Sequence, residues 1–164
     1  FFFSWYSIMC IAAGGPVYRL ISKEQAIIRA VATTLSLTQI TSAATKALVR
    51  DMRITMHDEY GIGIAAPQVG AGAAIFVAFI PNNIAPDVKP MPETVFYNPT
   101  LSIVETGGYV EMWESCLTIP DKIGKVKRRG EVIVNYFNEK GEPRSIEAKG
   151  FTAAVLQHEH DHLN

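Results

Sequence analysis

The residues best suited to chemistry are His158, Glu159 and His162, in a run that reads His-Glu-His-Asp-His. Residues four apart share one face of an α-helix, so the imidazoles of His158 and His162 can converge on one metal ion. Glu159 would then lie beside the ion and exchange protons with a water molecule on it. The alternative is a solvated polar helix end. The spacing favours a metal site.

A catalytic metal usually takes three protein ligands and leaves one position for water. Upstream of the histidines, the segment 114–118 offers the thiolate of Cys116, a ligand that such metals accept readily. A metallopeptidase that cleaves internal peptide bonds would instead need a ligand after the helix, and the sequence given contains none there. That rival hypothesis also leaves Cys116 and Gln68 unexplained.

Composition limits the other functions. A chain of 164 residues with 48% apolar composition suits one domain spanning 1–164. The 15 Lys and Arg residues nearly balance the 16 Asp and Glu residues, so no overall field recruits nucleic acid or anionic lipid. No apolar run reaches membrane-spanning length. We therefore expect a local site, without a sequence-specific nucleic acid or a membrane as partner.

The elements that must position these residues follow from periodicity. Apolar residues at three- and four-residue spacing predict a helix over 42–59, starting at Thr41-Ser42 and stopping at Tyr60-Gly61. The glycine-rich segment 61–70 lets backbone approach another group closely. Further predicted elements are strands over 74–80, 94–105, 131–137 and 144–149, a loop over 81–92, and a final helix over 151–164 with Thr152 as its cap.

The connections between these strands are too short for most parallel crossovers. The predicted fold class is therefore α+β, with mostly antiparallel strands packed around a C-terminal helix that carries the His-Glu-x-Asp-His motif.

Three blocks together resemble the peptide deformylase family. They are the glycine-rich Gly-Ile-Gly-Ile-Ala-Ala-Pro-Gln at 61–68, Glu-Ser-Cys-Leu-Thr at 114–118, and His-Glu-His-Asp-His at 158–162. The resemblance covers roughly 42–164. It implies removal of the formyl group from the N-terminal formylmethionine of nascent polypeptides. It also implies one metal ion on Cys116, His158 and His162, usually Fe(II), with zinc, nickel or cobalt as substitutes.

The same resemblance assigns the remaining site residues. Glu159 passes protons, and the side-chain amide of Gln68 and the backbone N–H of Leu117 stabilise the oxyanion. Asp161 pairs with Arg128, which braces the helix.

Substrate contacts are implied as well. The backbone of Ile62 and Gly63 would pair with the peptide in β fashion. Ala154 and Val155, together with Ile62, would line the pocket for the methionine side chain, although core packing explains them equally well. Glu114 is also assigned to substrate binding.

Some features depart from the family pattern. Ser115 replaces the usual glycine before the cysteine, and Thr118 replaces a serine. Residues 1–15 read as an apolar leader or a fragment end, and the C-terminus appears truncated, which should leave His162 in a fraying turn. These departures keep open a catalytically degenerate deformylase-like binding protein. The implied partners are nascent formylmethionyl peptides and the ribosome near its exit tunnel, in the bacterial cytoplasm or an organelle.

Overall fold

The computed structural model describes residues 20–22 and 24–164. The predicted leader over 1–15 lies outside these residues. In the described part of the chain, no helix is long and apolar enough to cross a membrane.

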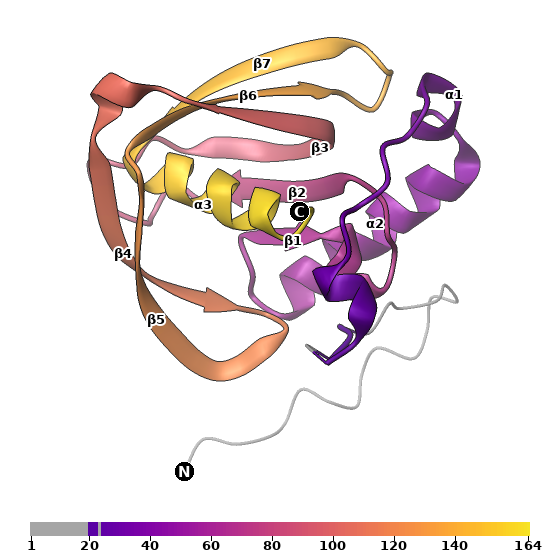
Figure 1. Cartoon of the computed structure of the whole chain (residues 1–164), viewed down its shortest axis with the longest axis horizontal. Helices are drawn as coiled ribbons and strands as arrows, with labels where there is room; N and C mark the ends of the chain where they lie inside the picture. Colours follow the sequence, from indigo (N-terminus) through magenta and orange to yellow (C-terminus); the bar gives the residue numbers. More distant parts are fainter. Residues whose placement is uncertain (1–19, 23) are drawn as a thin grey trace.

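A five-stranded antiparallel sheet forms the centre of the molecule, with the order β1-β2-β3-β6-β7 (Figure 1). Three of the predicted strands are present almost as expected, and the strand predicted over 94–105 begins three residues earlier. The glycine-rich segment contributes the short edge strand β1. The bounds are β1 Gly63–Ala65, β2 Ile75–Ile80, β3 Met91–Ile103, β6 Glu131–Phe137 and β7 Pro143–Lys149.

Helices cover both faces of this sheet. On β2, Ile75 and Val77 pack toward one helix, whereas Phe76 and Ala78 belong to the core around another. Burial on both faces explains why β2 reads as a continuous apolar run. The helix on the first face is α2, Ala43–Asp58, which matches the prediction. Its N-cap is Ser42, whose hydroxyl accepts a hydrogen bond from the backbone N–H of Thr45. It follows the short helix α1, Leu37–Ile40.

The opposite face holds α3, Gly150–Asp161, which carries the histidine motif. The predicted cap at Thr152 is wrong. The N-cap is Lys149, which makes no side-chain capping bond. The start of the helix is instead fixed by Gly150, which adopts a positive φ of 56° and donates its N–H to the Gly130 carbonyl at 2.8 Å.

The last turn of α3 is better anchored than we expected. His162 forms the C-cap, and the next residue, Leu163, is buried in the core. The Leu163 carbonyl accepts a hydrogen bond from the backbone of Ala32 at 2.8 Å. Contacts with a distant segment therefore help to hold the turn that carries His162.

A second sheet was not predicted from the sequence. It pairs β4, Tyr109–Cys116, with β5, Ile119–Arg129. Exposed and half-buried side chains alternate along β4, and β5 is rich in lysine and arginine, so neither strand shows the apolar run that marks a buried strand. Figure 1 shows α3 enclosed between this pair and the larger sheet, and α3 contacts strands of both.

Candidate metal centre

Two elements that are far apart in sequence meet at the histidine motif. His158 and His162 lie one turn apart on α3, with ring centroids 5.0 Å apart. Cys116, at the end of β4, lies opposite them, and its Sγ is 3.4 Å from Nε2 of His162. One potential ligand atom from each of these residues lies within 4.8 Å of the others. Such a group of one sulfur and two imidazole nitrogens fits a divalent transition metal.

His158 is oriented by a carboxylate behind it. Its Nδ1 lies 2.9 Å from a carboxylate oxygen of Glu114. An ionised carboxylate only accepts hydrogen bonds, so Nδ1 carries a proton, and in the neutral imidazole Nε2 keeps its lone pair for a metal. Burial opposes ionisation of Glu114, but hydrogen bonds from Arg128 and His158 hold its pKa below the usual value.

Arg128 joins the two elements. Its guanidinium donates to both carboxylate oxygens of Glu114 and, at 2.7 Å, to Asp161 on α3. The predicted pair between Arg128 and Asp161 is thus present. The carboxylate of Glu114 bonds to Arg128 and His158, so it supports the position of His158. The residue also lines the adjoining pocket, and the resemblance assigns it to substrate binding.

Cys116 sits where a thiolate is favoured. Burial opposes ionisation of the thiol, but hydrogen bonds with the two histidines and Thr118 outweigh it and lower the pKa of Cys116 to about 5. The Thr118 hydroxyl is 3.2 Å from the sulfur. A thiolate is the form of cysteine that binds metals. Ser115, beside it, has no positive φ, so the replacement of glycine causes no backbone strain there.

Glu159 is buried beside the histidines. Burial raises the pKa of its carboxyl to about 7, against the opposing effect of the neighbouring imidazoles. Its Oε2 is buried and has no hydrogen-bond partner among the described residues. A buried carboxylate oxygen without a partner is costly and suggests that a proton, a water molecule or a ligand completes it. A carboxyl with a pKa near neutrality is suited to exchanging protons.

Gly63 is required by Glu159. A Cβ placed on Gly63 would lie 2.2 Å from Oε1 of Glu159, a distance that no real contact allows. The sequence predicts that the backbone of this segment approaches another group closely. At Gly63 the group that approaches closely is the Glu159 side chain itself.

Both polar atoms of the Gln68 side-chain amide make hydrogen bonds. Its Oε1 accepts a hydrogen bond from the Ala65 backbone at 2.8 Å, which fixes the orientation of the amide. The NH₂ group then points toward the Cys116 sulfur at 3.5 Å. The bond to its own loop and the role of a donor in the site are compatible for Gln68 because they use different atoms.

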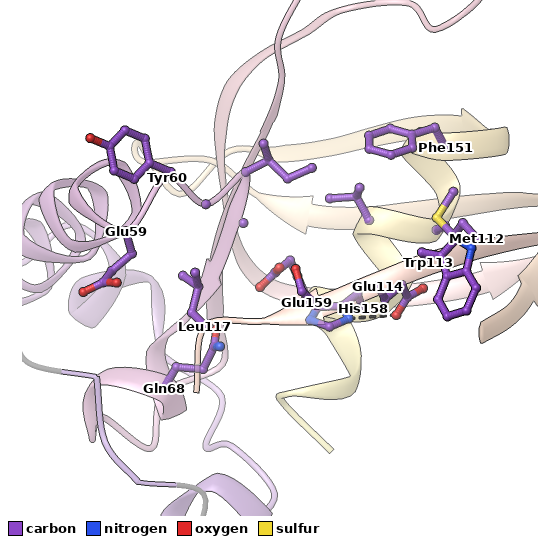
Figure 2. Close-up of a pocket in the computed structure, with 16 residues that line it drawn as sticks. Glu59, Tyr60, Gln68, Met112, Trp113, Glu114, Leu117, Phe151, His158 and Glu159 are labelled. Carbon is purple, nitrogen blue, oxygen red and sulfur yellow. Dashed lines mark hydrogen bonds and ion pairs between the residues drawn. The ribbon is translucent and has the colours of Figure 1, made fainter. Parts of the chain in front are cut away.

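A pocket of about 350 Å³ opens beside Glu159 and His158 (Figure 2). Gln68 and Gly63 also line it, whereas Cys116 and His162 line a neighbouring hollow that shares His158 and Glu114 with the pocket. The apolar part of the lining consists of Ile62, Met112, Leu117, Phe151, Ala154 and Val155.

The lining residues that were not assigned to the site from the sequence include four large side chains: Tyr60, Met112, Trp113 and Phe151. Met112 and Trp113 lie on β4, which was not predicted. Tyr60 was treated only as part of a helix stop. Phe151 begins the predicted final helix. Its position on the helix that carries the histidine motif was the one sequence signal that it lies near the site.

In this α+β fold a buried helix places two histidines close to a cysteine and a buried glutamate beside them. This arrangement is typical of a metal-dependent hydrolase. The family model described as polypeptide deformylase matches residues 17–164, and the chain belongs to this family.

Curated relatives and solved structures agree with this assignment. The peptide deformylase of Brucella suis biovar 1 is 44% identical over 115 residues, which cover 70% of this chain and 62% of the relative. The aligned stretch thus spans less than two thirds of that protein. The class I type b peptide deformylase of Acinetobacter baumannii bound to K2U is 32% identical with a TM-score of 0.84, covering 92% of this chain and 95% of the other.

Two further structures are similar. The same Acinetobacter baumannii enzyme with Met-Ala-Ser bound has a TM-score of 0.83 and 32% identity, over 91% of this chain and 94% of that one. The peptide deformylase of Ehrlichia chaffeensis has a TM-score of 0.81 and 28% identity, over 91% and 84% of the two chains.

Proposed function

We propose that this chain hydrolyses the N-formyl group of N-terminal formylmethionine on new polypeptides and releases formate. The observation that carries the proposal is the convergence of the ligand atoms of Cys116, His158 and His162 beside the buried Glu159, next to a pocket with an apolar wall. Membership of the polypeptide deformylase family supports it.

In this proposal Cys116 and the Nε2 atoms of His158 and His162 hold the metal. The thiolate-favouring surroundings of Cys116 and the carboxylate behind His158 support this ligand set. When bound, the ion acidifies water and so supplies a nucleophile near neutral pH.

Glu159 manages the proton. Its unpartnered Oε2 takes a proton from the attacking water and delivers it to the departing amine. Burial keeps the carboxyl away from bulk solvent, and its pKa near 7 allows it to carry the proton in both directions.

Gln68 and Leu117 stabilise the oxyanion that forms at the formyl carbon. Because its Oε1 accepts from the Ala65 backbone, the NH₂ group of Gln68 faces the site; one N–H is directed at Cys116, and the other is the donor in this proposal. Donors already in place cost no reorganisation when charge develops. The backbone N–H of Leu117 is the second donor in this proposal.

The pocket would take the methionine side chain against Ile62, Ala154 and Val155. The peptide itself would add to strand edges, because β1 and β4 each have a strand partner on one side only among the described residues. Ile62 and Gly63 offer backbone groups at the edge of β1. The Met-Ala-Ser peptide bound to the similar Acinetobacter baumannii enzyme supports a peptide substrate. We propose that the substrates are met near the ribosomal exit tunnel, in a bacterial cytoplasm or an organelle.

We propose Fe(II) as the native metal, with zinc, nickel or cobalt as substitutes. Iron and a thiolate ligand are both oxidised readily, whereas nickel resists that change. An iron-loaded protein should therefore lose activity in air several times faster than a nickel-loaded one. Equal half-lives in air would contradict the assignment of iron.

Formate release by anaerobically prepared protein tests the function itself. Formyl-Met-Ala-Ser should yield formate and the free peptide Met-Ala-Ser. Cleavage at an internal bond would indicate the rival metallopeptidase. Metal and peptide binding without formate release would indicate the degenerate binding protein.

A further inference from the structure

A second hollow reaches the proposed metal site from the side of β5. It has a volume of about 480 Å³ and lies between the first half of β5 and the C-terminal end of α3. A cavity of this volume has room for several water molecules. The metal ligands and three apolar or small residues of β5 line it: Cys116, His158, His162, Ile119, Ile123 and Gly124.

The three proposed ligands are not shared equally between the hollow and the substrate pocket. His158 lines both cavities, and Figure 2 shows it beside Glu159 on the pocket side. Cys116 and His162 line the hollow but not the pocket. An ion that moves through the hollow therefore meets all three ligands directly. An ion that moves through the pocket must pass Glu159 and Gln68 and meets one ligand.

The pocket is also the cavity that the proposed function gives to the peptide. A ligand seated in such a pocket covers most of its opening, so it would block a metal that used the same way out. Both cavities contain carboxylates, with Glu59 in the pocket and Asp161 in the hollow, so charge does not separate the two routes. The positions of the ligands and of the substrate do separate them, and both favour the hollow.

Glycine keeps the β5 side of the hollow open. Gly124 lies opposite Glu114 in the register of β4 and β5, and a Cβ added to it would meet no atom within 4 Å. Its φ is not positive, so the backbone conformation does not require glycine there. The neighbouring Ile123 is 66% exposed, which shows that this stretch of β5 borders solvent. A larger side chain at Gly124 would fill space that the fold leaves empty.

We propose that this hollow is the route by which the metal ion enters and leaves the site, separate from the pocket that takes the peptide. A metal site needs an entry path as well as ligands. Metal loading and substrate binding would then not compete for one opening. This inference rests on the metal site of the proposed function, but its test does not use formate release.

The test follows the release of zinc from the loaded protein into an excess of a chromogenic chelator. Gly124→Phe and Gly124→Trp should each slow release by about tenfold or more, because the added ring fills the hollow and raises the barrier to passage. A narrowed route slows uptake by the same factor, so the dissociation constant from chelator competition should stay within about twofold of the parent. A variant that disturbed the ligands would instead bind zinc more weakly and release it faster.

Two further variants complete the series. Ile119→Ala removes bulk from the lining of the hollow and should speed release severalfold, which gives a second reading if an aromatic side chain at Gly124 impairs folding. Lys125→Trp is the matched control, because it adds a ring to the same strand at a position that does not line the hollow. Its release rate should equal that of the parent.

The peptide Met-Ala-Ser tests whether the two routes are separate. At a concentration that saturates the pocket, with binding confirmed by calorimetry, it should change the rate of zinc release from the parent by less than about twofold. Release that the peptide slows strongly, or that the Gly124 variants leave at the parent rate, would overturn the inference. A parent that binds zinc but releases no formate would instead contradict the proposed function, and the release rates of the variants would still decide the route.

Discussion

Helix α3 and the β4–β5 pair hold their parts of the site by different means. Helix α3 carries His158 and Glu159 and is buried against the large sheet, with Ala153, Ala154 and Leu156 fully inaccessible. The β4–β5 pair carries Cys116 but forms a separate two-stranded sheet whose outer side chains are exposed. Apolar packing thus positions the helix that carries the histidines, whereas polar contacts orient His158 and hold the strand that carries the sulfur.

The site lies at the junction of these two regions. Arg128 joins them by bonding to Glu114 on β4 and Asp161 on α3. A metal held by ligands from both regions would be a second link. The comparison predicts that changes acting on Glu159 alter the chemistry with metal retained, whereas changes at the junction alter metal binding.

The largest effect should come from Glu159→Gln. The amide cannot exchange protons as the carboxyl does, so formate release should fall by about 10²–10⁴-fold. Metal content should be unchanged, because the residue is not a ligand in this account. Activity within tenfold of the parent would remove Glu159 from its role.

Gly63→Ala should act on the same carboxylate indirectly. The added methyl would force the Glu159 side chain to move, and a displacement of this kind can lower kcat by about tenfold to a hundredfold. Gly124→Ala is the matched control, a strand glycine whose added Cβ meets open space. Metal analysis and turnover should show bound metal in both variants but impaired catalysis only at Gly63. Equal turnover would contradict the close contact.

Arg128→Ala should have the smallest effect of the three on activity, acting through the metal. Without Arg128, Glu114 loses its partner and orients His158 less firmly, so metal affinity should fall about tenfold in a chelator competition. Arg129→Ala removes a neighbouring guanidinium that pairs with the exposed Glu105, and it should change affinity little. If both variants retained metal equally well, the junction would not depend on Arg128.

Sequence patterns predicted α2, four strands of the large sheet and the motif helix, because these elements show either apolar residues at a regular period or, as in β2, a continuous apolar run. The β4–β5 pair was missed for the opposite reason. Its outer face mixes charged side chains with the exposed Tyr109, Trp113 and Ile123, and its inner face is only half-buried, so no apolar repeat marks it.

The site divides in the same way. The spacing of His158 and His162 encodes their proximity within one helix, but the position of Cys116 depends on how two sheets meet. The bond from Glu114 to His158, and the contact of Gly63 with Glu159, likewise arise only from tertiary structure. The blocks that resemble the deformylase family indicated which segments meet, but not the atoms that touch.

X-ray absorption spectroscopy of the zinc-loaded protein tests most directly whether a metal bridges the two regions. We predict one sulfur at about 2.3 Å and two imidazole nitrogens at about 2.0–2.1 Å from the zinc. Cys116→Ser should remove the sulfur while the imidazole signal of any retained metal persists. A parent protein whose zinc has only nitrogen and oxygen neighbours, or a variant that keeps the sulfur, would contradict the assignment of Cys116 and the account built on it.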